Sequence, residues 1–430
     1  MHKMTKNTVF IFVIRAVAVM SAFGATEVMA GPPPSFETVG TVTKVAAGWN
    51  RGPGNKVQAT DGTTFYSLTG TWEDGPIKIV RSRDSGATWE PARIVAEMPF
   101  QWAFAGVATV AVSGDAAIPE RKIVHVVWEQ WDDNHFATVG IYYAWADDAD
   151  LNDPWTRAFS NPVRINGTIP AVDSWARTCI NTTPNGEIHV IFQGSADEKL
   201  YYTYASRYND EFTAPVSLPG QPSGWEDIEA TLDGDGNLHL AYPISDVTNT
   251  LFGLEYTRKP ADSMTWTTPV TVAPLVATGQ DEGFTSIAAY DADSIYIANH
   301  DWKDMYVYRT RDGGATWERT AVFNGTAEVM PTRHISIAVN QSHDIYVGTG
   351  FDHYLPNGDW DYEEAQIFRS TDRGRSFSNG GIIPNQTSVS INFDADGKAA
   401  INLWGTNVLE GAIYFTKEKR TGKRIGNPNA

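Results

Sequence analysis

Tryptophan, carboxylate and arginine residues recur close together in short polar segments along the chain. An aromatic plane can stack on the apolar face of a sugar ring, while carboxylate and guanidinium groups bind its hydroxyl and carboxylate groups. We therefore expect a carbohydrate-binding surface, with filling of space between structural elements as the alternative role of each Trp. The segments are Trp49-Asn50-Arg51, Gln101-Trp102, Trp175-Ala176-Arg177, Trp225-Glu226-Asp227, Asp281-Glu282, Arg333-His334, Trp128 to His135, His300-Asp301-Trp302 and Asp352 to Glu364.

The residues in these segments divide by the chemistry they can perform. Two converging carboxyl groups can hydrolyse a glycosidic bond, one as acid and the other as base or nucleophile. The candidates for this catalytic role are Asp132, Asp133, Glu226, Asp227 and Glu282. The candidates for substrate binding are Arg51, Arg177, Arg333, Trp102, Trp175, Trp225, His300 and Trp302.

Motifs for other kinds of site are missing from the sequence. It has no phosphate-cradling Gly loop, no Ser nucleophile elbow and no Cys/His spacing typical of zinc sites. Asp233-Gly234-Asp235-Gly236-Asn237 resembles the start of a calcium loop, but Ile244 stands where that loop needs an acid, so a hairpin turn is preferred. We expect no bound metal and no cofactor.

The elements that must position these segments are short strands that recur along the chain. A β-rich run follows a polar turn seven times, at Phe65 to Leu68, Ile123 to Trp128, Ile188 to Phe192, Leu238 to Tyr242, Ile295 to Ala298, Ile345 to Gly348 and Ala400 to Trp404. A third strand follows each run, and a more polar fourth strand follows several, as at Ala92 to Val95 and Pro162 to Ile165. Repeated four-stranded sheets without helical periodicity are typical of propeller blades. The sequence predicts an all-β, seven-bladed β-propeller, with six blades as the alternative.

The seventh copy has no clear fourth strand of its own, because Lys417 to Arg424 is basic and contains Gly. Val39 to Ala46 lies before the first copy and has no blade of its own. Pairing this segment with the last blade would cover two sheet edges that are otherwise open. We therefore predict a ring closed by the N-terminal strand, with closure by Lys417 to Arg424 as the alternative.

Three turns between third and fourth strands share one pattern. They are Ser82-Arg83-Asp84-Ser85-Gly86-Ala87-Thr88-Trp89, Thr310-Arg311-Asp312-Gly313-Gly314-Ala315-Thr316-Trp317 and Ser370-Thr371-Asp372-Arg373-Gly374-Arg375-Ser376-Phe377. This pattern resembles the Asp-box, or BNR, repeat of the sialidase-type propeller superfamily over essentially the whole mature chain. The Asp and hydroxyl groups can satisfy backbone donors in the turn, so the pattern stabilises folding and does not itself indicate an enzyme.

The resemblance implies a sialidase-like exo-glycosidase as the most specific function. Such an enzyme is expected to bind the sugar carboxylate with three arginines, for which Arg51, Arg177 and Arg333 are the candidates, and to use a Tyr nucleophile helped by Glu and an Asp acid-base. Arg51-Gly52-Pro53 departs from the expected Arg-Ile-Pro, and no Tyr is assigned as the nucleophile. A non-catalytic scaffold that binds a glycan or another secreted protein is a further alternative.

Three histidines favour a different alternative. His125, His189 and His239 occupy equivalent places in successive second strands, which resembles seven-bladed lyases of acidic polysaccharides that use His and Tyr as base and acid. Recurrence in register is more typical of packing, and packing is the preferred interpretation. The loop histidines His135, His300, His334 and His353 remain candidates.

The N-terminus and the composition indicate an exported protein. Lys3 and Lys6 precede an apolar stretch and then Val28-Met29-Ala30, which predicts a signal peptide over residues 1–30 and one propeller domain over residues 31–430. Without this segment the formal charge of −18 becomes −20, which argues against nucleic acid and anionic membranes as partners. We expect a secreted or periplasmic monomer without further membrane insertion, in which the single cysteine, Cys179, is a buried apolar residue.

Overall fold

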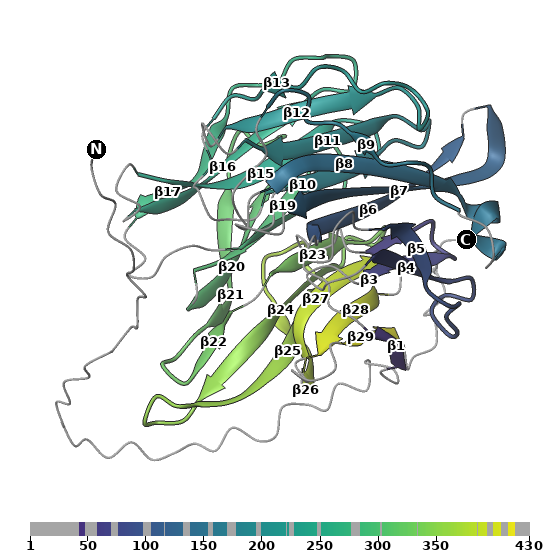
Figure 1. Cartoon of the computed structure of the whole chain (residues 1–430). Helices are drawn as coiled ribbons and strands as arrows, with labels where there is room; N and C mark the ends of the chain where they lie inside the picture. Colours follow the sequence, from purple (N-terminus) through teal and green to yellow (C-terminus); the bar gives the residue numbers. More distant parts are fainter. Residues whose placement is uncertain are drawn as a thin grey trace, which may run out of the picture. The chain divides into compact units, whose positions relative to one another are not determined.

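The computed structural model describes residues 43–47, 58–69, 76–97, 105–115, 117–131, 138–153, 158–169, 178–194, 199–220, 222, 228–246, 251–276, 284–301, 303–332, 334–384, 386–393, 399–405 and 412–417 (Figure 1). All of them belong to one compact unit, Phe36–Ala430. They form an all-β structure in which the one helix of the described residues is a 3-10 turn, η2 (Asp148–Asn152). In this part of the chain no helix has the length and apolar character needed to cross a membrane.

The described strands form seven antiparallel sheets, numbered here in chain order. The first three contain β2 (Gln58–Thr60), β3 (Phe65–Thr69), β4 (Ile77–Ser82) and β5 (Arg93–Ala96); β6 (Ala105–Asp115), β7 (Ile118–Trp131), β8 (Thr138–Asp147) and β9 (Val163–Arg164); and β10 (Thr178–Thr182), β11 (Ile188–Gln193), β12 (Leu200–Ala205) and β13 (Val216–Ser217). The fourth and fifth contain β14 (Glu229–Leu232), β15 (Leu238–Ser245), β16 (Phe252–Lys259) and β17 (Val270–Val276); and β18 (Thr285–Ala289), β19 (Ile295–His300), β20 (Asp304–Thr310) and β21 (Glu318–Asn324).

The last two sheets depart from the simple repeat. The sixth has five strands, because β22 (Val329–Pro331) and β23 (Ser336–Val339) pair with successive parts of the long β24 (Ile345–Tyr354), followed by β25 (Trp360–Ser370) and β26 (Ser378–Pro384). The seventh contains β27 (Gln386–Phe393), β28 (Ala399–Gly405) and β29 (Ala412–Lys417). Its fourth strand is β1 (Thr43–Ala47), which pairs with β29. The predicted pairing of the N-terminal segment with the last sheet is therefore confirmed.

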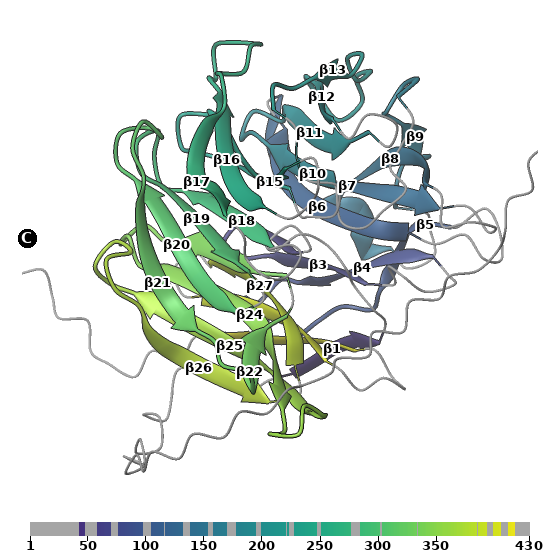
Figure 2. The same ribbon diagram turned by 90° about the vertical axis from the view of Figure 1, so that its left-hand side faces the viewer.

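The first strands of the sheets run side by side in the same direction. The second residues of β10 and β14 are joined by a hydrogen bond from the Ala230 N–H to the Cys179 Sγ (3.3 Å), and those of β18 and β23 by one from the Ile337 N–H to the Ser286 Oγ (3.1 Å). Each first strand contacts that of the next sheet, and β27 contacts β2. In Figure 2 the labelled first strands β6, β10, β18 and β27 lie around the middle of the view. The described first strands therefore start at a common level.

Apolar side chains fill the space between consecutive sheets. Six core clusters each combine residues of two neighbouring sheets, because alternate side chains of a strand point to opposite sides. In β7, for example, Val126 and Trp128 pack toward the first sheet, whereas Val127 packs toward the third. Most strands therefore contain continuous apolar runs, as expected for sheets covered on both faces.

A repeated His–Tyr–aromatic unit links the second to fifth sheets. His125, His189 and His239 each bind the hydroxyl of a tyrosine on the adjacent strand, at 2.8, 2.8 and 2.7 Å. Each tyrosine ring then meets, edge to face, an aromatic ring from a turn of the following sheet. The three units are His125–Tyr143–Phe212, His189–Tyr202–Trp266 and His239–Tyr256–Trp317. The preferred packing role of these histidines is confirmed, and the lyase alternative loses this support.

The three Ser/Thr-x-Asp-x-Gly turns stabilise themselves internally. In the first, the Gly86 N–H donates to the Ser82 Oγ (2.8 Å), and Asp84 accepts bonds from the Ser82 Oγ (2.8 Å) and from the Thr88 N–H (2.8 Å). The same bonds form in the turns of Asp312 and Asp372. Hydrogen bonds from Thr310 and Thr316 lower the pKa of Asp312 to about 2. These carboxylates are engaged in the turns, so they are not available as acid catalysts.

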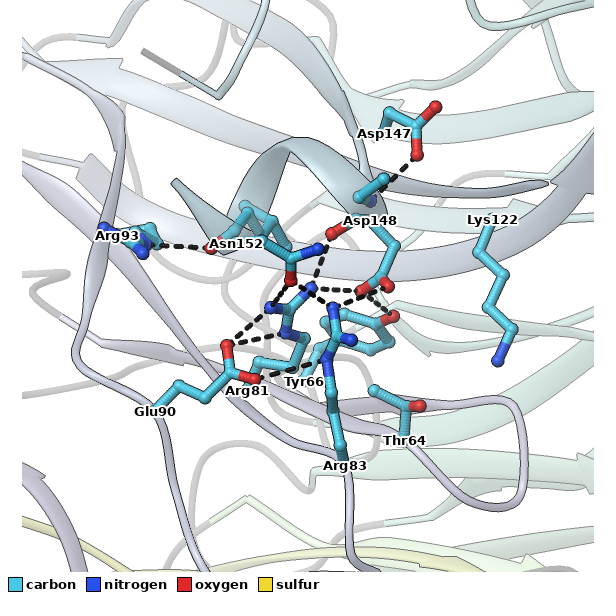
Figure 3. Close-up of polar contacts among 12 residues, drawn as sticks. Thr64, Tyr66, Arg81, Arg83, Glu90, Arg93, Lys122, Asp147, Asp148 and Asn152 are labelled. Atoms are coloured by element: carbon cyan, nitrogen blue, oxygen red, sulfur yellow. Dashed lines mark hydrogen bonds and ion pairs between the residues drawn. The ribbon is translucent and has the colours of Figure 1, made fainter. Parts of the chain in front are cut away.

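A charged cluster joins the first two sheets at the turn end of β4 (Figure 3). The Arg81 guanidinium is buried and donates to Glu90 (2.9 and 2.6 Å) and to the Oδ1 of Asp148 at the start of η2 (2.7 Å). The Tyr66 hydroxyl donates to the same Oδ1 (2.7 Å). This junction uses the ion pairs of a buried arginine with partly exposed carboxylates, where the second to fifth sheets use the aromatic units.

The buried histidines predict a loss of stability at mildly acidic pH. Burial lowers the pKa of His125 to about 3, and burial followed by the charge of Lys259 lowers that of His189 to about 3. The unfolded chain therefore binds more protons between pH 3 and 6.5, and the free energy of unfolding falls as the pH drops through this window, by about 1.4 kcal/mol per histidine per pH unit. Urea denaturation at pH 7.5, 6, 5.5 and 5 measures the slope.

His125→Gln is the matched variant for this measurement. It removes one titrating group while keeping a hydrogen-bonding side chain, so we expect its slope between pH 6 and 5 to be shallower by about one proton. Asp and Glu residues titrate mainly below pH 5. An unchanged slope would show that His125 is not held neutral by burial.

The turn that contains Gly314 lies close against Tyr256 of the preceding sheet. Its φ is +95°, and a Cβ at this position would lie 2.4 Å from the Cε1 of Tyr256. We expect Gly314→Ala to destabilise the fold by about 1–2 kcal/mol for the left-handed backbone and about 1–3 kcal/mol more for overpacking. Gly358→Ala is the control, because Gly358 has φ +86° and no atom within 4 Å of the added Cβ. Equal losses in the two variants, measured by urea denaturation, would contradict the contact.

Candidate functional site

The candidate site lies at the end of the strands opposite the three Asp-containing turns. We call this end the loop face, defined by the first residues of the first and third strands and the last residues of the second strands. In the third sheet these are Thr178, Leu200 and Gln193, which the strand register places together. The turns lie at the other end, where Ile295 pairs with Thr310. All the segments with candidate chemistry enter or leave strands at the loop face.

Every buried carboxylate of the described residues except Asp233 lies at the loop face. Two carboxylates, Glu129 near the end of β7 and Glu229 at the start of β14, are fully buried. Burying a carboxylate costs several kcal/mol unless polar partners compensate it, so such residues are rarely there for packing alone. The buried polar residues of this end are Thr69, Glu129, Gln130, Thr178, Gln193, Glu229, Thr285, His300, Thr349, Asp352, Glu363, Glu364, Gln366 and Gln386.

The sixth sheet contributes a hydrogen-bonded His–Glu pair. The His353 Nε2 lies 2.9 Å from the Glu364 Oε1, which also accepts a bond from the Gln366 Nε2 (2.7 Å). The His353 ring stacks on Tyr362, with ring centres 4.1 Å apart and planes at 10°. Glu364 is therefore held on both sides, and this arrangement can fix a carboxylate in one orientation or allow a proton to pass between His353 and Glu364.

Two further carboxylates face each other on the same pair of strands. Asp352 of β24 pairs directly with Glu363 of β25, and both are largely buried. The Tyr354 hydroxyl donates to the Asp352 Oδ2 (3.3 Å). The register of β24 and β25 therefore places two carboxyl groups opposite each other near the loop face.

Most of the residues predicted from the sequence lie outside the described residues. Of the thirteen candidates, His300 alone is described, and it is fully buried with its ring 5.4 Å from that of Phe284. Phe284 in turn packs against His334 (4.6 Å). His300 thus lies beneath the face rather than on it, and a contact between it and a ligand stays a prediction. The other twelve are Asp132, Asp133, Glu226, Asp227, Glu282, Arg51, Arg177, Arg333, Trp102, Trp175, Trp225 and Trp302.

The described strands nevertheless show where these segments attach. Asp132 and Asp133 directly follow β7, which contains Glu129 near its end, and Glu226 and Asp227 come just before β14, which begins with Glu229. Glu129 and Glu229 are not among the residues predicted from the sequence. A carboxylate at the end of an otherwise apolar strand was the available signal, but neither residue belongs to a recognisable motif.

Two segments that the sequence analysis treated as loops are largely strand. Trp128 to Trp131 belongs to β7, while Asp352 to Tyr354 and Trp360 to Glu364 continue β24 and β25. The polar composition of both segments is typical of loops, but pairing with the neighbouring strand keeps them extended. Their carboxylates are therefore held on rigid elements, where side chains are positioned more accurately than on loops.

The described tyrosines whose pKa is clearly shifted are not suited to act as a nucleophile or base. Where the pKa of a described tyrosine is shifted, it is raised, chiefly by burial. Tyr242 donates to Glu255 (2.8 Å), which is the kind of pair that a sialidase-like site needs, but it is fully buried and both burial and Glu255 raise its pKa. Among the described residues there is also no group of three or more potential metal ligands.

Comparisons with known proteins support a carbohydrate-related propeller. No protein-family model matches the chain. It is similar to a xyloglucanase of Paenibacillus sp, 23% identical over 300 residues that cover 63% of this chain and 26% of that protein. It is also similar to a xyloglucanase of Acetivibrio thermocellus, 21% identical over 367 residues that cover 80% and 40%. The chain spans between about a quarter and two fifths of the length of these curated relatives.

Solved structures agree on the fold. An ulvan lyase of polysaccharide lyase family 25, bound to -[GlcA(1-4)Rha3S]-, superposes with a TM-score of 0.53 and 12% identity over 87% of this chain and 95% of that one. A second polysaccharide lyase gives 0.54 and 10% over 87% and 92%. At these identities the likeness shows the fold alone. The chain has a β-propeller fold, and the similar proteins named here are carbohydrate-active enzymes.

Proposed function

We propose that this chain cleaves a glycan at the loop face as a glycoside hydrolase. The observation that supports this most directly is the burial of carboxylates at the loop-face ends of the strands, with Glu129 and Glu229 fully buried. Glycoside hydrolysis needs two carboxyl groups held at a fixed separation. A face whose strands already contain several ordered carboxylates fits this chemistry better than electrophilic or nucleotide-dependent chemistry.

In this proposal the carboxylates have two roles. Asp132, Asp133, Glu226, Asp227 and Glu282 are the catalytic candidates, because they belong to the segments that enter or leave the strands at the loop face. Glu129 and Glu229 are positioning residues, since fully buried side chains do not touch substrate. Buried like charges nearby would also raise the pKa of a catalytic carboxyl group, which suits a general acid.

The xyloglucanase relatives support hydrolysis, since they are named for cleaving a polysaccharide and match up to 80% of this chain. The sialidase-type version depends on Arg51, Arg177 and Arg333, which lie outside the described residues, and on a nucleophilic tyrosine that the described residues do not supply. It therefore remains a narrower form of the proposal.

A uronate lyase is the second candidate function. The His353–Glu364 pair favours it, because a histidine held by a carboxylate can act as a base. Against it, His125, His189 and His239 bind tyrosines in the interior, and the tyrosines of these pairs have raised pKa values. The described residues therefore support hydrolysis more strongly than elimination.

We also propose a blade number, a repeat type and a cellular location for this protein. The contacts of successive first strands, together with that between β27 and β2, support seven blades in one closed ring. The hydrogen bonds of the three Asp-containing turns support their assignment as Asp-box repeats. Lys3, Lys6 and the apolar stretch that follows support export to the periplasm or the outside of the cell after removal of residues 1–30.

Two measurements test the proposal. They are the mass of the reaction products and the loss of turnover when a candidate catalytic carboxylate is replaced by an amide. The protein lacking residues 1–30 is incubated with neutral, sialylated and uronate-containing glycans, and we expect products with one water added. Glu226→Gln and Asp227→Asn, made separately, should identify one residue whose loss lowers kcat by about 10²–10⁴-fold, because general acid–base catalysis contributes that much.

Glu211→Gln is the matched control, because Glu211 is an exposed carboxylate in the β12–β13 connection, at the other end of the strands. It should leave kcat unchanged. Unsaturated products would replace hydrolysis by elimination. Intact glycans throughout the panel would refute catalysis and leave glycan or protein binding as the function of the face.

A further inference from the structure

The charged cluster at the turn end of the first sheet encloses one carboxylate of the second sheet. The Asp148 Oδ1 accepts hydrogen bonds from the Tyr66 hydroxyl and from the Arg81 guanidinium, each at 2.7 Å. The Asp148 Oδ2 accepts one from Arg83 (3.3 Å), and Figure 3 shows the three donors around this carboxylate. A tyrosine and two arginines of one sheet therefore form a carboxylate site, which a residue of the next sheet occupies.

The fifth sheet repeats these donors at equivalent positions. In both sheets the tyrosine of the second strand pairs with the first arginine, whose Nε donates to a glutamate nine residues later (2.9 Å). In both, the second arginine is the second residue of the Asp-containing turn. Tyr66, Arg81, Arg83 and Glu90 of the first sheet thus correspond to Tyr296, Arg309, Arg311 and Glu318 of the fifth. The fifth sheet therefore has the same set of donors for a carboxylate.

The sixth sheet differs from the second at the place that Asp148 occupies. Asp148 directly follows β8, the third strand of its sheet, and the turn that contains Arg373 follows β25, the third strand of the sixth sheet. The Asp148 carbonyl oxygen accepts a hydrogen bond from the Arg81 Nη1. In the same way, the Arg373 carbonyl oxygen accepts one from the Arg309 Nη1 (3.0 Å). The sixth sheet therefore brings an arginine to the place where the second sheet brings a carboxylate.

Tyr296, Arg311 and Arg373 lie close together at this junction. The Tyr296 ring is buried, and a Cβ on Gly374 would lie 3.6 Å from its Cε1, so the turn of the sixth sheet is packed on the ring. Burial raises the pKa of Tyr296, whereas the charges of Arg311 and Arg373 lower it, as expected for guanidinium groups near this tyrosine. Both arginines are exposed, and neither side chain makes a hydrogen bond or an ion pair with another described residue. Their donors are available to a ligand.

Carboxylates close to these arginines are bonded to other groups. The Oδ1 of Asp291, which lies near Tyr296, accepts hydrogen bonds from two N–H groups of its own turn (3.1 and 2.6 Å). Glu318 binds Arg309 (2.9 Å), and the carboxylates of the two Asp-containing turns accept bonds within those turns. Arg311 and Arg373 thus contribute two positive charges with no carboxylate bonded to them in the described part of the chain.

We propose that Tyr296, Arg311 and Arg373 form a binding site for the carboxylate group of a small acidic ligand. The first sheet shows how the recognition works, because there a tyrosine and two arginines bind a carboxylate of the protein itself. Hydrogen bonds between guanidinium and carboxylate groups are about twice as strong as those between neutral groups. The site lies at the turn end, away from the loop face, so it is separate from the proposed glycan cleavage and goes beyond it.

NMR line broadening of small ligands tests the proposal, because it detects weak complexes that exchange rapidly. The probes are acetate, which matches the side chain of Asp148, and acetamide, its neutral analogue. At low ionic strength, where salt screens the arginines little, we expect the protein to broaden the methyl signal of acetate and not that of acetamide. Arg311→Gln and Arg373→Gln should each raise the Kd for acetate about tenfold, because each removes a hydrogen bond between charged groups.

Arg375→Gln is the matched control, because Arg375 is an exposed arginine of the same turn as Arg373. It removes the same charge but no proposed contact, so it should bind acetate like the parent. All three variants should keep the parent's Tm, because the substituted side chains are exposed. No broadening of acetate, or equal broadening of both ligands, overturns the proposal. A Kd that is unchanged in Arg311→Gln and Arg373→Gln, or raised as much by Arg375→Gln, also overturns it, since binding would then lie elsewhere or depend on net charge alone.

Discussion

Coverage of each sheet by its neighbours is the constraint on which this structure depends. The strands are apolar on both sides, so a single sheet exposes two hydrophobic faces and cannot be stable alone. Six clusters of buried side chains each join two consecutive sheets, and none of them is confined to one. Pairing of β1 with β29 completes the last sheet, so folding of the last sheet requires residues from near the other end of the chain.

Carboxylates have different surroundings at the two ends of the strands. At the turn end, the carboxylates of Asp84, Asp312 and Asp372 accept hydrogen bonds from their own turns, and Trp317 packs edge to face on Tyr256 of the preceding sheet. At the loop face, carboxylates such as Glu129 and Glu229 lie at strand ends next to segments that carry the candidate chemistry. The engaged carboxylates thus lie at one end of the strands, and the segments with candidate chemistry lie at the other.

The repeating part of the fold could be predicted from the sequence because its signals are local. Polar turns followed by apolar runs located the second and third strands, and the unassigned N-terminal segment indicated the pairing of β1. The equivalent positions of His125, His189 and His239 indicated packing, which their bonds to tyrosines confirm. Each of these predictions depends on spacing along the chain rather than on contacts between distant segments.

The long β24–β25 hairpin and the buried carboxylates could not be predicted in this way. Asp352 to Glu364 is as polar as a loop, and only pairing across the hairpin makes it a strand. Glu129 and Glu229 are about one hundred residues apart and belong to no motif, so their common position at the loop face follows from the way successive sheets align. Which side chains lie close together depends on the folded chain. The sequence shows which chemical groups are present, but it does not show which of them are in contact.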